Sequence, residues 1–235
     1  MANRAYAALW LRASTGEREM RRDERLAQFE QLLRTVPFAR TQQGFRSLVI
    51  RALDPSETPV ADHDLRTSPA TSLEVVELAR EHAHPDTAFE VEAYWDLWVR
   101  DPESGLWSEQ PQKLEIIAHG PEYDGGVAMQ EGDFLADLGF EHLFTGHAHL
   151  LAARAGAGAR TDSSAPVHPE EARFFAVMTR PENLREYREK TSENIRRLMN
   201  WVRAAETAVP AQRSRMWSEG EENFEARLDE ILTAG

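Results

Sequence analysis

Apolar and polar residues alternate strictly from position 89 to position 100, where each apolar side chain is followed by a charged or aromatic one. A period of two places the two sets on opposite faces of a β-strand. Residues 101–105, Asp-Pro-Glu-Ser-Gly, have the composition of a tight turn. A partner strand is expected from Leu106 to His119. The pattern therefore predicts a long amphipathic β-hairpin, which is the strongest secondary-structure signal in the chain.

The register of this hairpin follows from placing its apolar residues opposite one another. If Asp101 pairs with Leu106, then Ala93 lies opposite Leu114. A slip of one residue would set the apolar positions against the polar ones, so the pattern specifies the register. Pro111 cannot donate to a ladder and marks an edge strand or a bulge. The other predicted pairs are Val91–Ile116, Phe89–Ala118, Arg100–Trp107, Trp98–Glu109 and Tyr94–Lys113.

Apolar spacing also predicts the elements that precede the hairpin. In chain order they are an interior strand at 4–12, a helix at 17–36, a strand at 45–53, a short edge strand at 58–65 and a helix at 71–82. This order gives a βαβ start followed by a long hairpin. We therefore expect an α+β fold with an open, mainly antiparallel sheet, resembling a ferredoxin-like or similar two-layer sandwich, plus C-terminal helices.

The segment after the hairpin has weaker signals. Residues 120–139 are rich in Gly and Asp and are expected to be loop, with a short helix near Phe134. An amphipathic helix is predicted at 181–206, with Pro181 as its first residue and Pro210 beyond its end. The predicted organisation is an α+β sheet domain at 1–151, a linker or mobile loop at 152–168, and a helical region at 169–235 that packs on the sheet or on a second copy.

Composition and charge narrow the possible functions. The chain has no cysteine, which excludes disulfides, thiolate zinc sites and thiol nucleophiles. Forty acidic and 27 basic side chains give a formal net charge of −13. That field opposes nucleic-acid and membrane binding. Its explanation is either solubility alone or a protein partner, for which a basic protein or a second copy of the chain is expected. With no signal peptide and no apolar stretch of about 18 residues, we expect a cytoplasmic protein.

Three histidines form the candidate metal site. His142, His147 and His149 lie in the apolar segment 139–151, and two histidines spaced by two residues share one face of a strand. Neutral imidazole binds divalent transition metals, so one hypothesis is a metal-dependent, hydrolase-like enzyme. The spacing matches no known metal signature, and a histidine in an apolar segment is more often a core residue bonded to a carbonyl. The chain also lacks the common phosphate-loop, dinucleotide-binding, nucleophile-elbow and zinc-protease motifs.

The polar face of the hairpin is the candidate binding surface. It carries aromatic and basic side chains of the types that dominate protein interfaces. On this face Glu92 and Glu115 are also expected to oppose one another across the two strands. The alternative is that the C-terminal helices cover the face and make its aromatics part of the core. We call this set the hairpin surface, and it consists of Tyr94, Trp98, Arg100, Trp107 and Lys113.

The leading functional hypothesis is a non-catalytic protein-interaction module, of which an inhibitor or immunity-type protein is one form. It follows from the aromatic polar face, the negative charge and the lack of a reaction motif. The metal-dependent enzyme is one alternative. The other is a small-molecule-binding domain with a pocket between sheet and helices, lined by Trp10, Trp95 and Phe89.

Overall fold

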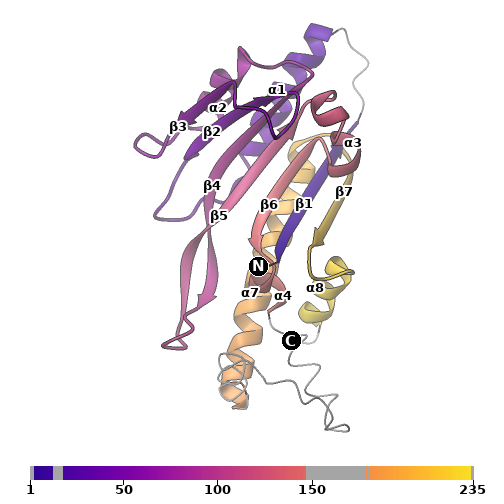
Figure 1. Ribbon diagram of the computed structural model, residues 1–235. Helices are drawn as coiled ribbons and strands as arrows, with labels where there is room; N and C mark the ends of the chain where they lie inside the picture. The colour runs from indigo at the N-terminus through magenta and orange to yellow at the C-terminus, as the bar shows by residue number, and fades with distance from the viewer. Residues whose placement is uncertain (1–2, 13–17, 147–177, 179, 234–235) are drawn as a thin grey trace.

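The computed structural model describes residues 3–12, 18–146, 178 and 180–233 (Figure 1). Its centre is an open antiparallel sheet of seven strands in the order β3-β2-β4-β5-β6-β1-β7. The strands are β1 (Arg4–Leu11), β2 (Ser47–Ala52), β3 (Ala61–Asp64), β4 (Thr87–Arg100), β5 (Trp107–His119), β6 (Phe134–Phe140) and β7 (Ala211–Ser218). The helices are α1 (Arg18–Leu33), α2 (Ser72–Arg80), η1 (Tyr123–Gly125), α3 (Ala128–Glu131), α4 (His142–Thr145), α7 (Pro181–Ala208) and α8 (Phe224–Thr233).

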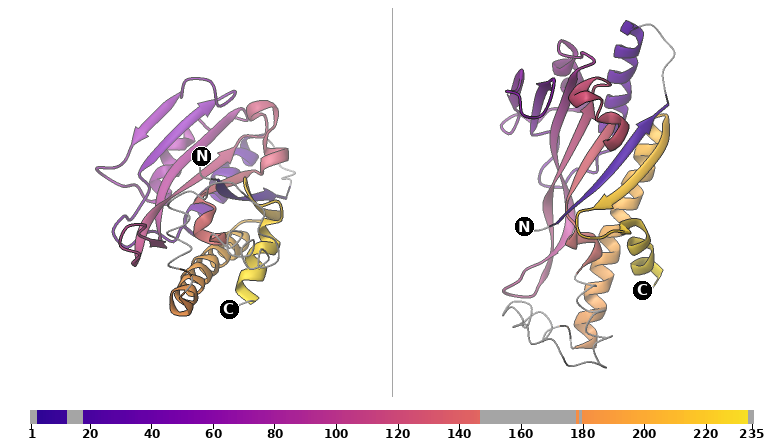
Figure 2. Two further views of the ribbon diagram at one scale, coloured as in Figure 1. Left: turned by 60° about the horizontal axis from the view of Figure 1, so that its bottom comes forward. Right: turned by 45° about the vertical axis from the view of Figure 1, so that its right-hand side comes forward.

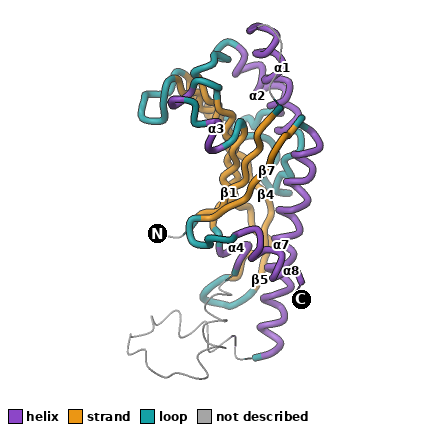
Figure 3. The backbone as a smooth tube through the Cα atoms, turned by 90° about the vertical axis from the view of Figure 1, so that its right-hand side faces the viewer, coloured by secondary structure: helices purple, strands orange, loops and turns teal. Residues whose placement is uncertain are grey.

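The fold has two main layers, as the sequence predicts. Helices α1, α2 and α7 lie on one side of the sheet, which we call the inner face (Figures 2 and 3). Alternate strand residues such as Phe89, Val91 and Ile116 pack there against Phe29 and Leu198. The opposite side is the outer face, and near one end it is overlaid by the segment 120–132, which contains η1 and α3.

The predicted hairpin register is confirmed at every pair. Ala93 lies opposite Leu114, and the remaining predicted partners face one another from Ala118 to Trp107. The turn closes with Asp101 N–H donating to the carbonyl of Leu106 at 2.9 Å. Pro111 lies opposite Asp96 in a part of β5 that β6 does not reach. Because the Asp96 carbonyl points away from β5, this is a non-hydrogen-bonded pair and the proline removes no ladder bond.

The structure also confirms the predicted helix cap, the predicted ends of the long helix and the interior position of the first strand. Thr71 caps α2, and Glu74 returns the bond to the Thr71 N–H, which completes a capping box. Pro181 occupies the first turn of α7, and the helix ends before Pro210. Strand β1 has an interior position between β6 and β7. Within the described chain, no helix has both the length and the apolar character needed to cross a bilayer.

Two strands lie where the sequence predicts other structure. Residues 134–140 form β6 between β5 and β1, so the prediction of loop with a short helix near Phe134 is wrong. Phe134, Leu135 and Ala136 are all buried, so the segment lacks the alternation that marks a half-exposed strand. In the region predicted to be helical, residues 211–218 form β7, which pairs with β1 at the sheet edge. Its four consecutive exposed residues give no buried face to recognise.

Candidate functional site

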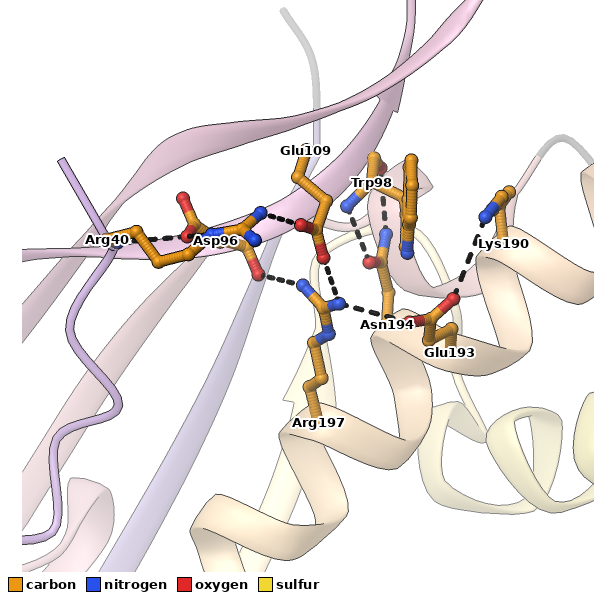
Figure 4. A network of polar contacts seen from close by, with 8 residues as sticks. All are labelled: Arg40, Asp96, Trp98, Glu109, Lys190, Glu193, Asn194 and Arg197. Atoms are coloured by element: carbon orange, nitrogen blue, oxygen red, sulfur yellow. Dashed lines mark hydrogen bonds and ion pairs between the residues drawn. The ribbon is translucent and has the colours of Figure 1, made fainter.

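The helix α7 docks on the free edge of the hairpin. Beyond Glu92, the side of β4 that faces away from β5 is no longer paired with β2. Asn194 of α7 takes the place of a neighbouring strand (Figure 4). Its Oδ1 accepts from Trp98 N–H at 2.8 Å, and its Nδ2 donates to Trp98 O at 2.9 Å. Arg197 Nη1 donates to the carbonyl of Asp96 at 2.7 Å. Side chains thus satisfy backbone groups that an edge strand would leave open.

Charged side chains reinforce this contact. Arg197 also pairs with Glu109 on β5 and with Glu193 one turn earlier on α7, the latter at 3.0 Å (Figure 4). Arg40, from the loop after α1, binds Asp96 and Glu109 from the other side. Arg40 is 73% exposed, so its pairs contribute little to stability individually. Together these pairs connect three segments that are distant in the sequence.

The structure places all five residues of the hairpin surface on the outer face of the hairpin. Trp98 and Trp107 contact α7. Lys190 Nζ lies 3.3 Å from the centre of the Trp98 ring, and the rings of Trp107 and Tyr187 are 5.5 Å apart. Both tryptophans are half-buried. A large part of their surface is therefore engaged within the chain.

The predicted opposition of Glu92 and Glu115 is present in the register. Lys113 lies beside both carboxylates, with its Nζ 3.1 Å from Glu92 and 2.7 Å from Glu115. The ammonium offsets the like-charge repulsion that two opposed carboxylates would otherwise have. This cluster is therefore a compact ion-pair group on the outer face, and it engages Lys113 of the hairpin surface.

The structure describes only one of the three histidines of the candidate metal site. His142 opens α4 and stacks on Phe140 with ring centres 5.7 Å apart. Burial lowers its pKa. His147 and His149 lie outside the described residues. In the ranges that the structure describes, no three His, Asp or Glu side chains are arranged to hold a metal ion.

His119 is a buried histidine that the sequence did not single out. It ends β5, is 4% exposed and stacks on Tyr123 with ring centres 6.0 Å apart. Its Nδ1 lies 2.9 Å from the carbonyl of Gly132, so Nδ1 carries the proton. Burial lowers its pKa. The ring joins the end of β5 to the segment that overlies the outer face.

Acidification is expected to destabilise the protein partly through His119. Because its pKa is lowered on folding, the unfolded chain binds the proton more readily as the pH falls through about 6.5. The free energy of unfolding therefore decreases across and below that range. His119→Asn keeps a hydrogen-bond donor for the carbonyl of Gly132 but removes the titrating group. We expect the free energy of unfolding of this variant to depend less on pH when urea unfolding is compared at pH about 7.5 and about 5.5. An unchanged slope would assign the effect to other groups, such as His142.

The predicted ligand pocket is not formed by the three residues assigned to it. Trp95 and Phe89 are 1% and 2% exposed and pack in the core, whereas Trp10 lies on the outer face. An apolar cavity between the sheet and α7, lined in part by Leu32 and Trp201, has a volume of about 20 Å³. That volume is close to the space of one water molecule and far below that of a metabolite site.

A second group of aromatic and basic side chains lies on the outer face of β1 and β7. We call it the β7 surface. The rings of Tyr6 and Trp217 stack with centres 5.5 Å apart, and the Arg213 guanidinium lies 3.6 Å from the centre of Trp10. Arg215 lies 5.7 Å from the ring of Trp217. These five residues, Tyr6, Trp10, Arg213, Arg215 and Trp217, form a continuous ladder because β1 and β7 are paired in register.

Polar contacts anchor both ends of this ladder. Tyr6 donates its hydroxyl proton to Glu219 at 3.0 Å, and burial together with this bond raises the pKa of Tyr6 to about 12. Trp10 Nε1 donates to the carbonyl of Met129 at 3.2 Å. The two aromatic side chains are therefore held in place on the sheet. A surface that is ordered in advance loses less entropy when it binds a partner.

Two arginines give the β7 surface its charge. Elsewhere on the outer face, Asp137 pairs with Arg4 at 2.6 Å and Glu90 pairs with Arg51 at 2.9 Å. Glu219, beside the β7 surface, accepts hydrogen bonds from Tyr6 and from Arg4 N–H. Within the described chain, Arg213 and Arg215 form no ion pair, and each lies beside an aromatic ring. Among the described residues of this face, the basic side chains without an ion pair include Arg213 and Arg215 on β7 and Arg100 on the hairpin.

Sequence reasoning missed the β7 surface, although part of a signal was present. Arg213, Arg215 and Trp217 alternate with smaller or less polar residues, which is the period of a strand. Tyr6 and Trp10 fell within the segment 4–12, which was predicted to be an interior strand. No family model, no curated protein and no solved structure matches this chain. The functional argument therefore rests on the side chains themselves.

Proposed function

We propose that this protein is a non-catalytic interaction module that binds a protein partner through the outer face of its sheet. The observation that carries the proposal is the β7 surface, where three half-buried aromatics and two arginines without ion pairs lie side by side. Tyr, Trp and Arg are the residues that contribute most to protein interfaces. An inhibitor that blocks another protein is one form of this function.

The two faces of the sheet differ in how far helices cover them, and this difference supports the proposal. The inner face is closed by α1, α2 and α7, which bury its apolar residues. An antiparallel sheet commonly leaves its other face in water, so aromatic residues that lie there away from α7 are available to a partner. Tyr94 and Lys113 of the hairpin surface lie on the same outer face and extend the proposed contact toward β4. Trp98 and Trp107 serve mainly to dock α7.

The proposal predicts different outcomes for two tryptophans. Wild-type protein, Trp217→Ala and Trp107→Ala would each be immobilised and used for affinity capture from the native host, with quantitative mass spectrometry. We expect a partner whose recovery falls at least tenfold with Trp217→Ala, because an interface aromatic contributes about 2 kcal/mol or more. Recovery with Trp107→Ala should stay within about threefold.

Controls make this comparison decisive. Each variant must first match the wild-type far-ultraviolet circular dichroism spectrum. If a folded Trp217→Ala recovers every partner at wild-type levels, the β7 surface is not the binding site. Loss of recovery with Trp107→Ala alone would instead favour the hairpin surface as the principal contact.

A further inference from the structure

The exposed edge of β7 has backbone groups available for pairing. Glu219 N–H donates to the carbonyl of Arg4 at 3.0 Å, which makes that pair hydrogen-bonded. In an antiparallel ladder, the even-numbered residues of β7 from Ser214 to Ser218 must then direct their N–H and C=O groups away from β1. Met216 confirms this direction, because its N–H donates outward to Glu225 of α8 at 2.6 Å.

Only part of this edge is covered by the described chain. The carboxylate of Glu225 shows that an outward N–H of β7 can bind an anionic acceptor, but it reaches Met216 alone. Two residues earlier, the N–H and C=O of Ser214 have no hydrogen-bond partner within the described ranges. Residues 212–215 are all exposed. An uncovered edge of this kind is a template for an added strand.

The side chains on this edge indicate the charge of the added strand. Arg213 and Arg215 project to the outer face from alternate positions, about 7 Å apart along β7. Carboxylates spaced by two residues on a neighbouring strand would lie beside both guanidinium groups. The net charge of −13 does not prevent this contact, because charges beyond about 8 Å are screened at physiological ionic strength.

The same geometry disfavours two other occupants. A second copy pairing antiparallel about Ser214 would place Arg213 opposite Arg215 of the other copy, and like charges in that position destabilise a sheet. A nucleic-acid strand lacks the alternating N–H and C=O groups that pair with an open strand edge.

Resting on the proposed function, we infer that the partner contributes an extended segment with carboxylates at alternate positions, which adds to the sheet beside β7. Backbone pairing with the edge at Ser214 supplies part of the affinity. Ion pairs with Arg213 and Arg215 select an acidic segment and set its register. The ring of Trp10, which already stacks on Arg213, holds that guanidinium in position.

The direct test uses synthetic peptides and the full chain. The probe is a fluorescein-labelled, alternating Thr-Glu-Val-Glu-Thr-Glu-Val peptide, titrated by fluorescence polarisation. Three comparison probes are the same peptide with Gln for Glu, the same peptide with two central prolines, and an oligothymidylate of similar length. We expect the acidic peptide to bind at least tenfold more tightly than each comparison probe. Tighter binding of the oligothymidylate, or equal binding of the proline peptide, would overturn the inference.

A matched pair of double variants isolates the two arginines. The double variant Arg213→Glu, Arg215→Glu should bind the acidic peptide at least tenfold more weakly than the wild-type protein does. Arg196→Glu with Arg203→Glu, at exposed positions of α7, changes the net charge equally and should have less than a threefold effect. Equal losses in both variants would show a long-range charge effect and contradict the inference. The inference would also be contradicted if sedimentation showed that the wild-type protein is a dimer and that the Arg213→Glu, Arg215→Glu variant is a monomer.

Failure of this inference is distinguishable from failure of the proposed function. If the native partner is lost with Trp217→Ala but retained with the Arg213→Glu, Arg215→Glu variant, the β7 surface binds a partner in another way and only the added strand is refuted. If neither change affects capture, both proposals fail. Loss with both changes supports both.

Discussion

Asn194→Ala is expected to lower the free energy of unfolding by about 3 kcal/mol. Asn194 is 1% exposed and bonds three backbone groups, the N–H and C=O of Trp98 and the carbonyl of Leu143 at 3.0 Å. Alanine would leave these groups without partners where water is excluded, and each such loss costs about 1–3 kcal/mol. Equilibrium unfolding in urea, monitored by tryptophan fluorescence, measures the difference directly.

Asn200→Ala is the matched control. Asn200 is exposed on the same helix, so the substitution changes the same atoms without removing a buried bond. We expect its effect to stay within about 0.5 kcal/mol. If Asn194→Ala also costs less than 1 kcal/mol, water satisfies the Trp98 backbone in the variant, and α7 is not required at the hairpin edge.

The role of Asn194 shows one limit of sequence interpretation. The apolar period of the long helix identifies Ile195 and Leu198 as core-facing, and both are fully buried. The same period says nothing about a buried amide beside them. Two of its three partners belong to a residue 96 positions earlier in the chain, at a strand edge that exists only because β2 stops pairing at Glu92. Such a contact depends on tertiary arrangement rather than on a local pattern.

The elements that the sequence did predict share a local cause. The hairpin register follows from alternation on two adjacent strands and a turn, all within 31 residues from Phe89 to His119. The capping box of Thr71 and Glu74 spans one helical turn. In both cases the interacting residues are close in sequence, so their chemistry can be recognised without knowledge of the fold.

The missed elements depend on distant partners. Strand β6 is buried between β5 and β1, and β7 is a mostly polar strand whose pairing with β1 joins residues about 200 positions apart. Because β7 was not predicted, the neighbours of Tyr6 and Trp10 were unknown. The hairpin surface, by contrast, was placed correctly on one face, and contact with the C-terminal helices was one of the two alternatives for it. The sequence pattern could not identify Tyr187 and Lys190 as the contacting residues.

The distribution of charge on the outer face favours an acidic partner, whereas the net charge alone suggests a basic one. The total of −13 suggests a basic partner. On the outer face, however, Asp137, Glu90, Glu92 and Glu115 each have a basic neighbour within 3.1 Å. The basic groups left without an ion pair there, among the described residues, include the two guanidinium groups of β7 and that of Arg100. At short range an unpaired charge determines which ligand group is bound, while the net charge mainly affects the rate of encounter.

Trp95→Ala is expected to lower the free energy of unfolding by about 4 kcal/mol, and Trp217→Ala by about 1 kcal/mol or less. Trp95 is 1% exposed and packs against Phe144 and Trp201, with ring centres 5.8 and 6.0 Å away, so its truncation leaves a large core cavity. Trp217 loses only a partly exposed stack with Tyr6. Urea unfolding of the two variants under identical conditions gives both values.

A conservative variant separates volume from polarity at Trp95. Its Nε1 has no hydrogen-bond partner within the described chain, so Trp95→Phe removes an unsatisfied donor while keeping most of the ring volume. We expect that change to cost only about 1 kcal/mol. If Trp217→Ala proved as destabilising as Trp95→Ala, the outer-face aromatics would belong to the core. The composition of the β7 surface would then be explained by folding. A loss of partner capture by the Trp217→Ala variant would in that case reflect unfolding rather than a lost binding contact.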